Sequence, residues 1–168
     1  EIARKKGISV WTGYFNEATA KNIVKEIGHV DVVTGSNVFA HVDDIQEILR
    51  AANIVLTPEG VCIVEVHYLK DLLDLNQYDT IYHEHVFYFT LTPLIPLFAR
   101  HGLEIFHAER IPIHGGSLRI FAAHRGAEAV RKSIPELLAR ESAAGVATAA
   151  YYRRFSDRAG RVKADLIR

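Results

Sequence analysis

The sequence has no methionine, a single cysteine and no apolar run that approaches the length of a membrane span. Because Cys62 is alone, an internal disulfide is excluded, and its place in an apolar run favours a reducing compartment. The first residues show no signal-peptide pattern. We therefore expect a cytoplasmic protein with no membrane partner.

Neither sign of charge is in excess. Lysine and arginine together number 20, as do aspartate and glutamate, so the formal net charge is zero. This balance offers no electrostatic attraction for nucleic acid or for an anionic membrane surface. With 49% hydrophobic residues in 168 positions, the chain has enough apolar material for one ordinary globular domain.

Both ends have the pattern of interrupted helices. Glu1–Lys6 resembles the last turns of a helix stopped by Gly7, and Tyr151–Arg168 ends within a helical pattern. We interpret the sequence as part of a longer protein, and we expect this piece alone to be inactive.

Apolar periodicity in the first half predicts alternating strands and helices. Strands are predicted at 8–11, 30–34 and 61–66, and helices after Asn16 and from near Asp44 to a break at Pro58–Gly60. The run Val61–Val66 is almost entirely apolar, which is typical of a central parallel strand covered on both faces. The pattern therefore predicts an α/β fold with a mostly parallel sheet.

The second half predicts how this sheet closes. A polar insert at 70–89 is followed by a helix from Thr92 to Gly102 and by strands at 103–113 and 117–124. The short connection His114-Gly115-Gly116 makes these two strands an antiparallel hairpin. Helices are predicted beyond Gly126, so we expect one domain at 1–126 and a helical segment at 127–168 that leads into a further domain.

Residues Tyr82–His85 place two imidazoles, a carboxylate and a phenol in four consecutive positions. Imidazole titrates nearest to neutral pH, so proton transfer is easiest here. The insert follows the strand at 61–66, and ligands of open parallel sheets bind outside the carboxyl ends of the strands. His41 follows the neighbouring strand, which favours a proton-transfer site over an ordinary polar loop.

Three further residues are candidates for cofactor contacts. Tyr14 and Phe15 follow the first predicted strand and can stack on a flat ring such as adenine, although they can equally cap the core. Asn37 follows the second strand, where it can bind a polar ligand or only accommodate a tight turn.

Other chemistries have weaker support. His83, Glu84 and His85, with His41, His67 or His114, contain ligand types that suit zinc or iron, so a metal-dependent hydrolase or oxygenase remains an alternative. No spacing matches a helical histidine pair or a Cys/His finger, and we expect no metal in this chain. There is no G-x-S-x-G elbow, P-loop or G-x-G-x-x-G, so we expect any glycine-rich cofactor loop upstream of Glu1.

Four motifs together resemble one family. They are Gly35–His41 (GSNVFAH), Gly60–Val66 (GVCIVEV), Tyr82–His85 (YHEH) and His114–Arg119 (HGGSLR). In this order they are similar to the S-adenosylmethionine-dependent C-methyltransferases of nucleotide-linked keto-deoxysugars, which methylate carbon 3 of the sugar. The resemblance extends over essentially the whole chain.

The resemblance implies a partial class I methyltransferase (Rossmann-like) domain followed by helices of a C-terminal domain. It also implies S-adenosyl-L-methionine as cofactor, with zinc confined to an N-terminal module whose cysteines this sequence lacks. The first strands and the glycine-rich loop of the family are likewise outside the sequence. The implied partner is a small-molecule nucleotide-sugar in deoxysugar biosynthesis, not a nucleic acid.

The resemblance also implies roles for the clustered residues. His85 matches the general base of the family, and Tyr82, Glu84 and His41 line the same site. His114 and Ser117, in the hairpin motif, are expected at the substrate. An O- or N-methyltransferase on the same fold, or a non-enzymatic binding module, remains an alternative.

Overall fold

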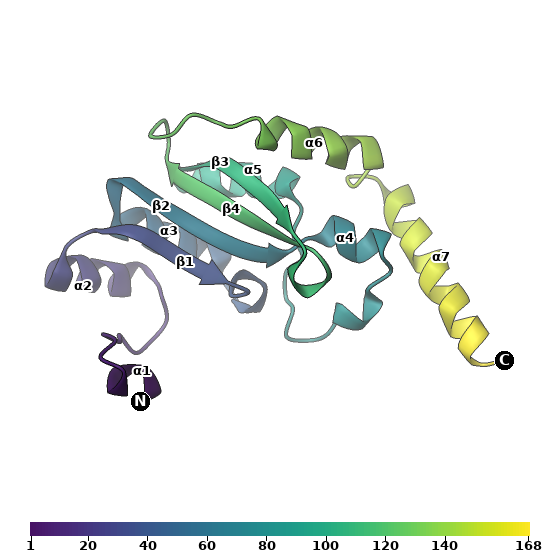
Figure 1. The fold of residues 1–168 in the computed structure, drawn as a ribbon, viewed down its shortest axis with the longest axis horizontal. Helices are drawn as coiled ribbons and strands as arrows, with labels where there is room; N and C mark the ends of the chain where they lie inside the picture. The colour runs from purple at the N-terminus through teal and green to yellow at the C-terminus, as the bar shows by residue number, and fades with distance from the viewer.

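Four strands form one mixed sheet in the order β1-β2-β4-β3 in the computed structural model, which describes residues 1–168 (Figure 1). The strands are β1 Val30–Ser36, β2 Leu56–His67, β3 Leu103–Ile111 and β4 Ser117–His124. The α-helices are α1 Ile2–Lys5, α2 Glu17–Ile27, α3 Ile45–Val55, α4 Leu69–Asp74, α5 Leu91–Arg100, α6 Ser133–Ala144 and α7 Ala149–Leu166. Single 3₁₀ turns occur at Phe39–His41, Tyr78–Thr80 and Ile113–Gly115.

The strand pairings confirm an α/β fold that closes with an antiparallel hairpin. β1 runs parallel to β2, whereas β4 pairs antiparallel with both β2 and β3. Val64 of β2 therefore lies between Gly35 of β1 and Ile120 of β4. The sheet is therefore mixed. One of its three strand pairings is parallel, and the other two, both of which involve β4, are antiparallel.

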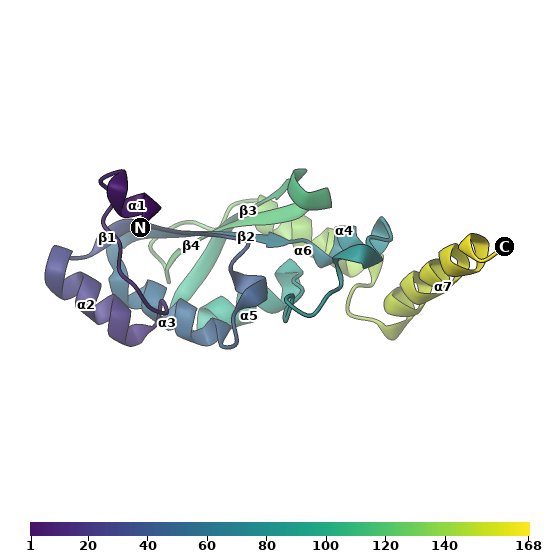
Figure 2. The same cartoon turned by 90° about the horizontal axis from the view of Figure 1, so that it is seen from below.

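Strand β2 has one buried face and one half-exposed face. Cys62, Val64 and Val66 are almost fully buried, while Glu65 and His67, on the opposite face, are only partly covered. Figure 2 shows the cause, because α2, α3 and α5 lie together on one side of the sheet. The prediction of a strand covered on both faces is wrong for this chain.

The stretch at 8–11 does not form the predicted strand. No other strand lies beside it, and Ile8 and Val10 stay exposed. The amide of Ile8 donates to the carbonyl of Ala3 at 3.1 Å, and side chains hold the rest of the segment, since Arg4 donates to the carbonyl of Val10 and the Trp11 indole donates to Glu26 at 3.0 Å. Without a partner strand for its backbone, β propensity alone does not make a strand.

Helices α2 and α3 begin where the sequence predicts them. The side chain of Asn16 accepts a hydrogen bond from the amide of Thr19 at 3.0 Å, and Asp44 accepts one from Gln46 at 2.8 Å. Helix α3 ends earlier than predicted, at Val55, because β2 already begins at Leu56 and runs through Pro58.

Helix α5 begins at Leu91, one residue before the predicted cap Thr92, and its first turn is capped from a distant helix. Glu141 of α6 is fully buried and accepts three hydrogen bonds from this turn. The donors are the amide of Leu91 at 2.6 Å, the amide of Thr92 at 2.8 Å and the hydroxyl of Thr92 at 2.5 Å. A negative charge at a helix N-terminus is also favoured by the helix dipole.

The C-terminal helices are attached at several points. The hydroxyl of Ser133 lies 2.7 Å from Nδ1 of His107 and accepts from the amide of Ala108, which fixes the start of α6 against β3. Gly145 ends α6 in the left-handed conformation, with φ 77°. Helix α7 then extends away from the sheet, as Figure 1 shows, and the hydroxyl of Tyr151 anchors its first turn to Asp74 at 2.6 Å.

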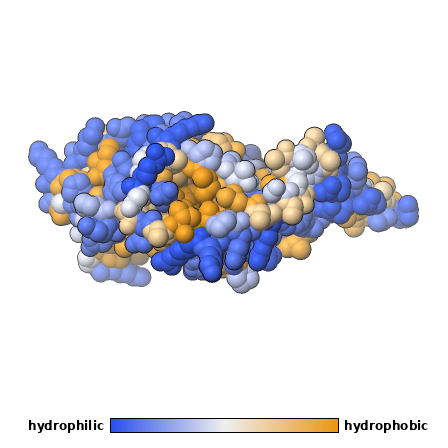
Figure 3. Space-filling view, turned by 90° about the horizontal axis from the view of Figure 1, so that it is seen from above, coloured by the Kyte–Doolittle hydropathy of each residue, from blue (hydrophilic) through white to orange (hydrophobic).

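On the face that Figure 3 shows, hydrophobic residues form a central patch and several smaller ones, with hydrophilic residues between them. None of the helices combines the length and the hydropathy that crossing a bilayer requires.

Candidate active site

His85 lies at the centre of the predicted site and is 7% exposed. Its Nδ1 is 3.0 Å from the carbonyl oxygen of Thr80, which can only accept, so Nδ1 carries the proton. The other ring nitrogen, Nε2, therefore carries no proton and can accept one. It lies 2.9 Å from the hydroxyl of Tyr82, which donates a hydrogen bond to it. Both contacts fix the tautomer and the orientation that a general base needs.

Three more imidazoles surround this ring. The ring centroids of His41 and His67 lie 4.9 Å and 5.2 Å from that of His85. His114 follows at 5.5 Å from His67. The four rings come from the loop after β1, the end of β2, the insert and the hairpin turn, so the fold gathers them from across the sequence.

Two backbone contacts hold the insert against the sheet. Tyr68, just after β2, pairs with Phe89 in an isolated parallel bridge, which closes the insert into a loop. The amide of Val86 donates to the carbonyl of Ala40 at 2.8 Å. These contacts bring the insert beside His41, as the order of strands and loops predicts.

Glu84 contributes its backbone to the site and not its carboxylate. Its side chain is exposed, whereas its carbonyl oxygen lies 3.0 Å from Nδ1 of His41. His83 is exposed and makes no hydrogen bond within the chain. No group of three or more His, Cys, Asp or Glu side chains is arranged to hold a metal ion, so a metal-dependent hydrolase has no ligand set in this structure.

An open cavity of about 430 Å³ adjoins the imidazoles. His85, Tyr82, His67 and His114 all line it. Burial lowers the pKa of His67 below its ordinary 6.5, and the neighbouring imidazoles of His85, His114 and His41 lower it further. His67 therefore presents a neutral ring to the cavity at neutral pH.

The depressed pKa of His67 makes the folded state sensitive to acid. Between the lowered pKa and about 6.5, the unfolded chain binds more protons than the folded chain, so stability falls as pH falls through this range. We expect His67→Gln to lose less stability than the parent chain when urea unfolding is compared at about pH 7.5 and about pH 5.5. Part of the loss should remain, because burial also lowers the pKa of His101. Equal losses in both chains would contradict the prediction.

The hairpin turn explains why its motif contains two glycines. His114, Gly115 and Gly116 all have positive φ, at 52°, 79° and 127°. A Cβ atom on Gly116 would lie 2.2 Å from a carboxylate oxygen of Asp71, so no larger residue fits there. This turn presents the exposed ring of His114 to the cavity.

Ser117 has a different environment from the one expected at a substrate. It is 1% exposed, and its hydroxyl donates to the carbonyl of Ile113 at 3.0 Å. The structure therefore places this hydroxyl inside the turn that carries His114, not on the cavity lining.

None of the three cofactor candidates lines the cavity beside the imidazoles. Tyr14 is 88% exposed and leaves its ring free to stack, whereas Phe15 is half-buried and packs against the core. Asn37 adopts φ 54° at the end of β1, and its backbone amide donates to the carbonyl of Glu65. Its side-chain carboxamide makes no hydrogen bond within the chain. A free aromatic face and a free carboxamide suit an adenosyl group.

Sequence reasoning considered His67 only as a possible metal ligand, although its ring is the third nearest to that of His85, after those of Tyr82 and His41. It is the last residue of β2, at the end of a strand where ligands are expected. Its position in the strand was the available signal. The alternation along β2 placed it on the half-exposed face.

Two family models match this chain, each over a different part of it. Residues 5–108 match the model described as a methyltransferase domain, and residues 112–168 match the C-methyltransferase C-terminal domain. The C-methyltransferase NovU of Streptomyces niveus is 39% identical over 98% of this chain. The chain spans 40% of the length of that relative.

Solved structures share the fold at low identity. A possible histamine N-methyltransferase from Thermotoga maritima has a TM-score of 0.53 and 18% identity, with 73% of this chain and 66% of that chain covered. A SAM-dependent methyltransferase from Anabaena variabilis has a TM-score of 0.52 and 17% identity, with 74% and 63% covered. Both similarities concern the fold alone.

Proposed function

Because this chain belongs to the methyltransferase-domain family, we propose that its residues serve methyl transfer from S-adenosylmethionine to a carbon atom, with His85 as the base. The observation that carries this proposal is the fixed tautomer of His85, which lines a cavity and whose Nδ1 is held by Thr80. The match of residues 112–168 to a C-methyltransferase domain supports carbon as the methylated atom.

A carbon beside a ketone must lose a proton before it becomes nucleophilic. In the proposed reaction the C–H proton moves to Nε2 of His85, and the electron pair moves onto the ketone oxygen as an enolate. The imidazolium so formed keeps its Nδ1–H bond to Thr80. The Tyr82 hydroxyl, which donates to Nε2 in this structure, would then donate to the enolate oxygen.

The proposed cofactor contacts are Tyr14, Phe15 and Asn37. The exposed ring of Tyr14 would stack on the adenine, with Phe15 beneath it at the edge of the core, and the carboxamide of Asn37 would bind a polar group. S-adenosylmethionine, when bound, supplies a methyl group already activated on a sulfonium. Proton removal and positioning are what remain for the side chains of this chain.

We propose a nucleotide-linked keto-deoxysugar as the methyl acceptor. The four sequence motifs that resemble sugar C-methyltransferases support this class, as does the identity with NovU. His114 on the cavity lining would bind the sugar, with Ser117 shaping its turn, while His41 and Glu84 complete the surroundings of His85. Deoxysugar biosynthesis in the cytoplasm is the corresponding role.

The test is the position of the transferred methyl group. We expect the complete gene product, given ¹³C-methyl S-adenosylmethionine and a ¹³C-labelled nucleotide-linked keto-deoxysugar, to form a new ¹³C–¹³C bond, detected by carbon–carbon coupling in the NMR spectrum. A methyl group on oxygen or nitrogen would contradict the proposed enolate. Absence of product with keto-deoxysugars, together with product from other ketones, would contradict only the acceptor class.

A further inference from the structure

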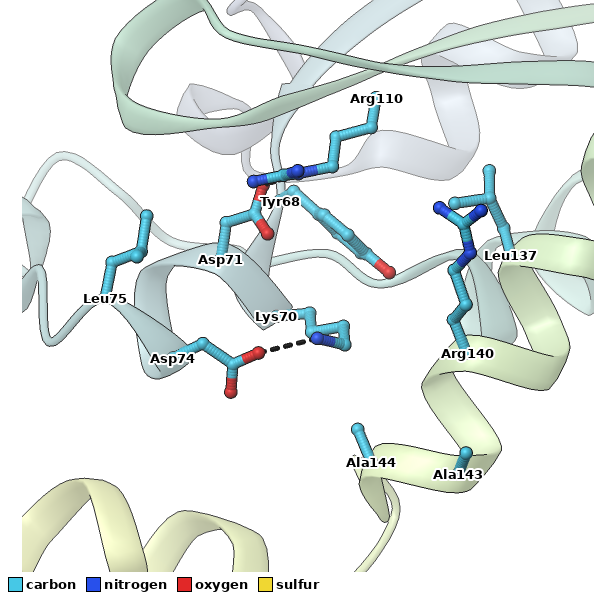
Figure 4. Close-up of a pocket in the computed structure, with 10 residues that line it drawn as sticks. All are labelled: Tyr68, Lys70, Asp71, Asp74, Leu75, Arg110, Leu137, Arg140, Ala143 and Ala144. Carbon is cyan, nitrogen blue, oxygen red and sulfur yellow. Dashed lines mark hydrogen bonds and ion pairs between the residues drawn. The ribbon is translucent and has the colours of Figure 1, made fainter.

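A second cavity of about 440 Å³ lies between α4, the end of β3 and α6 (Figure 4). None of the four imidazoles lines it. Its size is within the range of small-molecule sites, about 300–1,000 Å³. Half of its ten lining residues are hydrophobic, among them Tyr68, Leu75 and Leu137, and the other half are charged.

Every carboxylate around this cavity already has a partner. Asp74 pairs with Lys70 at 2.6 Å, and Asp71 pairs with Nε of Arg110 at 2.5 Å. Glu141, buried beside the cavity, accepts its three hydrogen bonds from the first turn of α5. Both carboxylates that line the cavity are thus paired with a cation.

Two donors, by contrast, have no partner. Arg140 of α6 makes no hydrogen bond or ion pair within the chain, and its side chain reaches into the cavity (Figure 4). Tyr68 is 2% exposed, and its hydroxyl lies near the carboxylate of Glu141 without a hydrogen bond of normal geometry. Burial, and then the negative charge of Glu141, raises the pKa of Tyr68, so the hydroxyl keeps its proton. A buried, unpaired hydroxyl costs stability unless a ligand or water satisfies it.

Figure 4 shows the hydroxyl of Tyr68 pointing toward the space that Lys70 and Arg140 border from opposite sides. Lys70 gives one hydrogen bond to Asp74 and retains two N–H groups. Three donors from three parts of the chain therefore converge, two of them positively charged. An oxyanion with several oxygens matches such a set, and a guanidinium binds phosphate through paired hydrogen bonds.

We propose that this cavity binds the phosphate group of a small organic phosphate, held by Arg140, Lys70 and the hydroxyl of Tyr68. The apolar side chains of Leu75 and Leu137 would contact the organic part, which a free phosphate lacks. The inference stands on this cavity alone and does not rest on methyl transfer. An experiment can therefore refute either proposal without refuting the other.

The cavity also adjoins the imidazole site around the hairpin turn. Arg110 lines both this cavity and a smaller one at the turn, and Gly115 lines both that smaller cavity and the one beside His85. The phosphate can thus belong to the methyl acceptor or to a separate molecule. Competition between the probe and the acceptor distinguishes the two sources.

The test is calorimetric titration of the complete gene product with phenyl phosphate and, separately, inorganic phosphate. We expect phenyl phosphate to bind more tightly than phosphate, and Arg140→Gln to weaken its binding by about 10- to 100-fold, the effect of one charge-assisted hydrogen bond. Tyr68→Phe should weaken it less, because a neutral donor is lost. In the complete gene product, a raised KM for the acceptor would assign the site to the acceptor, and an unchanged KM would assign it to a separate ligand.

The matched control is Arg161→Gln on α7, an exposed arginine that lines none of these cavities. It should leave the affinity unchanged. Equal weakening by Arg161→Gln and Arg140→Gln would show general charge screening and overturn the site. Equal affinity for the two probes, or no binding up to about 10 mM, would also overturn it.

Discussion

Replacement of His85 by asparagine should lower the rate of methyl transfer by about 10²–10⁴-fold, the usual contribution of a positioned general base. Asparagine can keep a hydrogen bond to the carbonyl of Thr80, but it has no basic nitrogen in the place of Nε2. The loss should therefore concern proton removal more than folding. Single-turnover kinetics of the complete gene product measure it, and acceptor hydrogen exchange in heavy water isolates the proton step.

His83→Asn is the matched control, because His83 lies two residues away, is exposed and makes no hydrogen bond within the chain. It should leave both exchange and turnover unchanged. If His85→Asn retains exchange and turnover, His85 is not the base. If the two variants lose the same activity, the effect belongs to the loop as a whole and not to the imidazole of His85.

Replacement of Glu141 by alanine should lower the free energy of unfolding by about 2–5 kcal/mol. The change removes the cap of α5 and leaves the buried amide of Leu91 and the amide of Thr92 without an acceptor. It also removes the carboxylate that links α6 to the first turn of α5 by hydrogen bonds. Urea unfolding followed by circular dichroism measures the difference.

Glu136→Ala on the same helix is the comparison, since Glu136 is exposed in the first turn of α6. Its loss should cost no more than about 1 kcal/mol, the effect of one charge near a helix N-terminus. Similar costs for the two substitutions would show that the three hydrogen bonds of Glu141 contribute little. A loss of α5 helicity in Glu141→Ala alone would support capping as the cause.

The elements that depend on local sequence were predictable. Asn16 caps α2 through a residue three positions away. The glycines between β3 and β4 allow the tight turn that joins these two strands. The gathering of His41 and His85 was also predictable, since the order of strands and loops places both at one edge of the sheet.

What escaped prediction depends on residues far apart in the chain. Glu141 lies 49 and 50 positions from the donors it caps, and no local pattern marks such a pair. The stretch at 8–11 has strand-like composition, but its state is decided by whether a partner strand lies beside it. Likewise, the covering of β2 follows from where the helices pack.

The boundary between the two family matches falls inside the β3–β4 hairpin. One match ends at residue 108 within β3, and the other begins at 112, so β4 and Glu141 belong to the second while β3 and α5 belong to the first. Recombination at this boundary would therefore exchange one of the four strands, β4, together with the cap of a helix. For such a chimaera to fold, both parents must share the hairpin register and the Glu141 contact, so these two segments are expected to be inherited together.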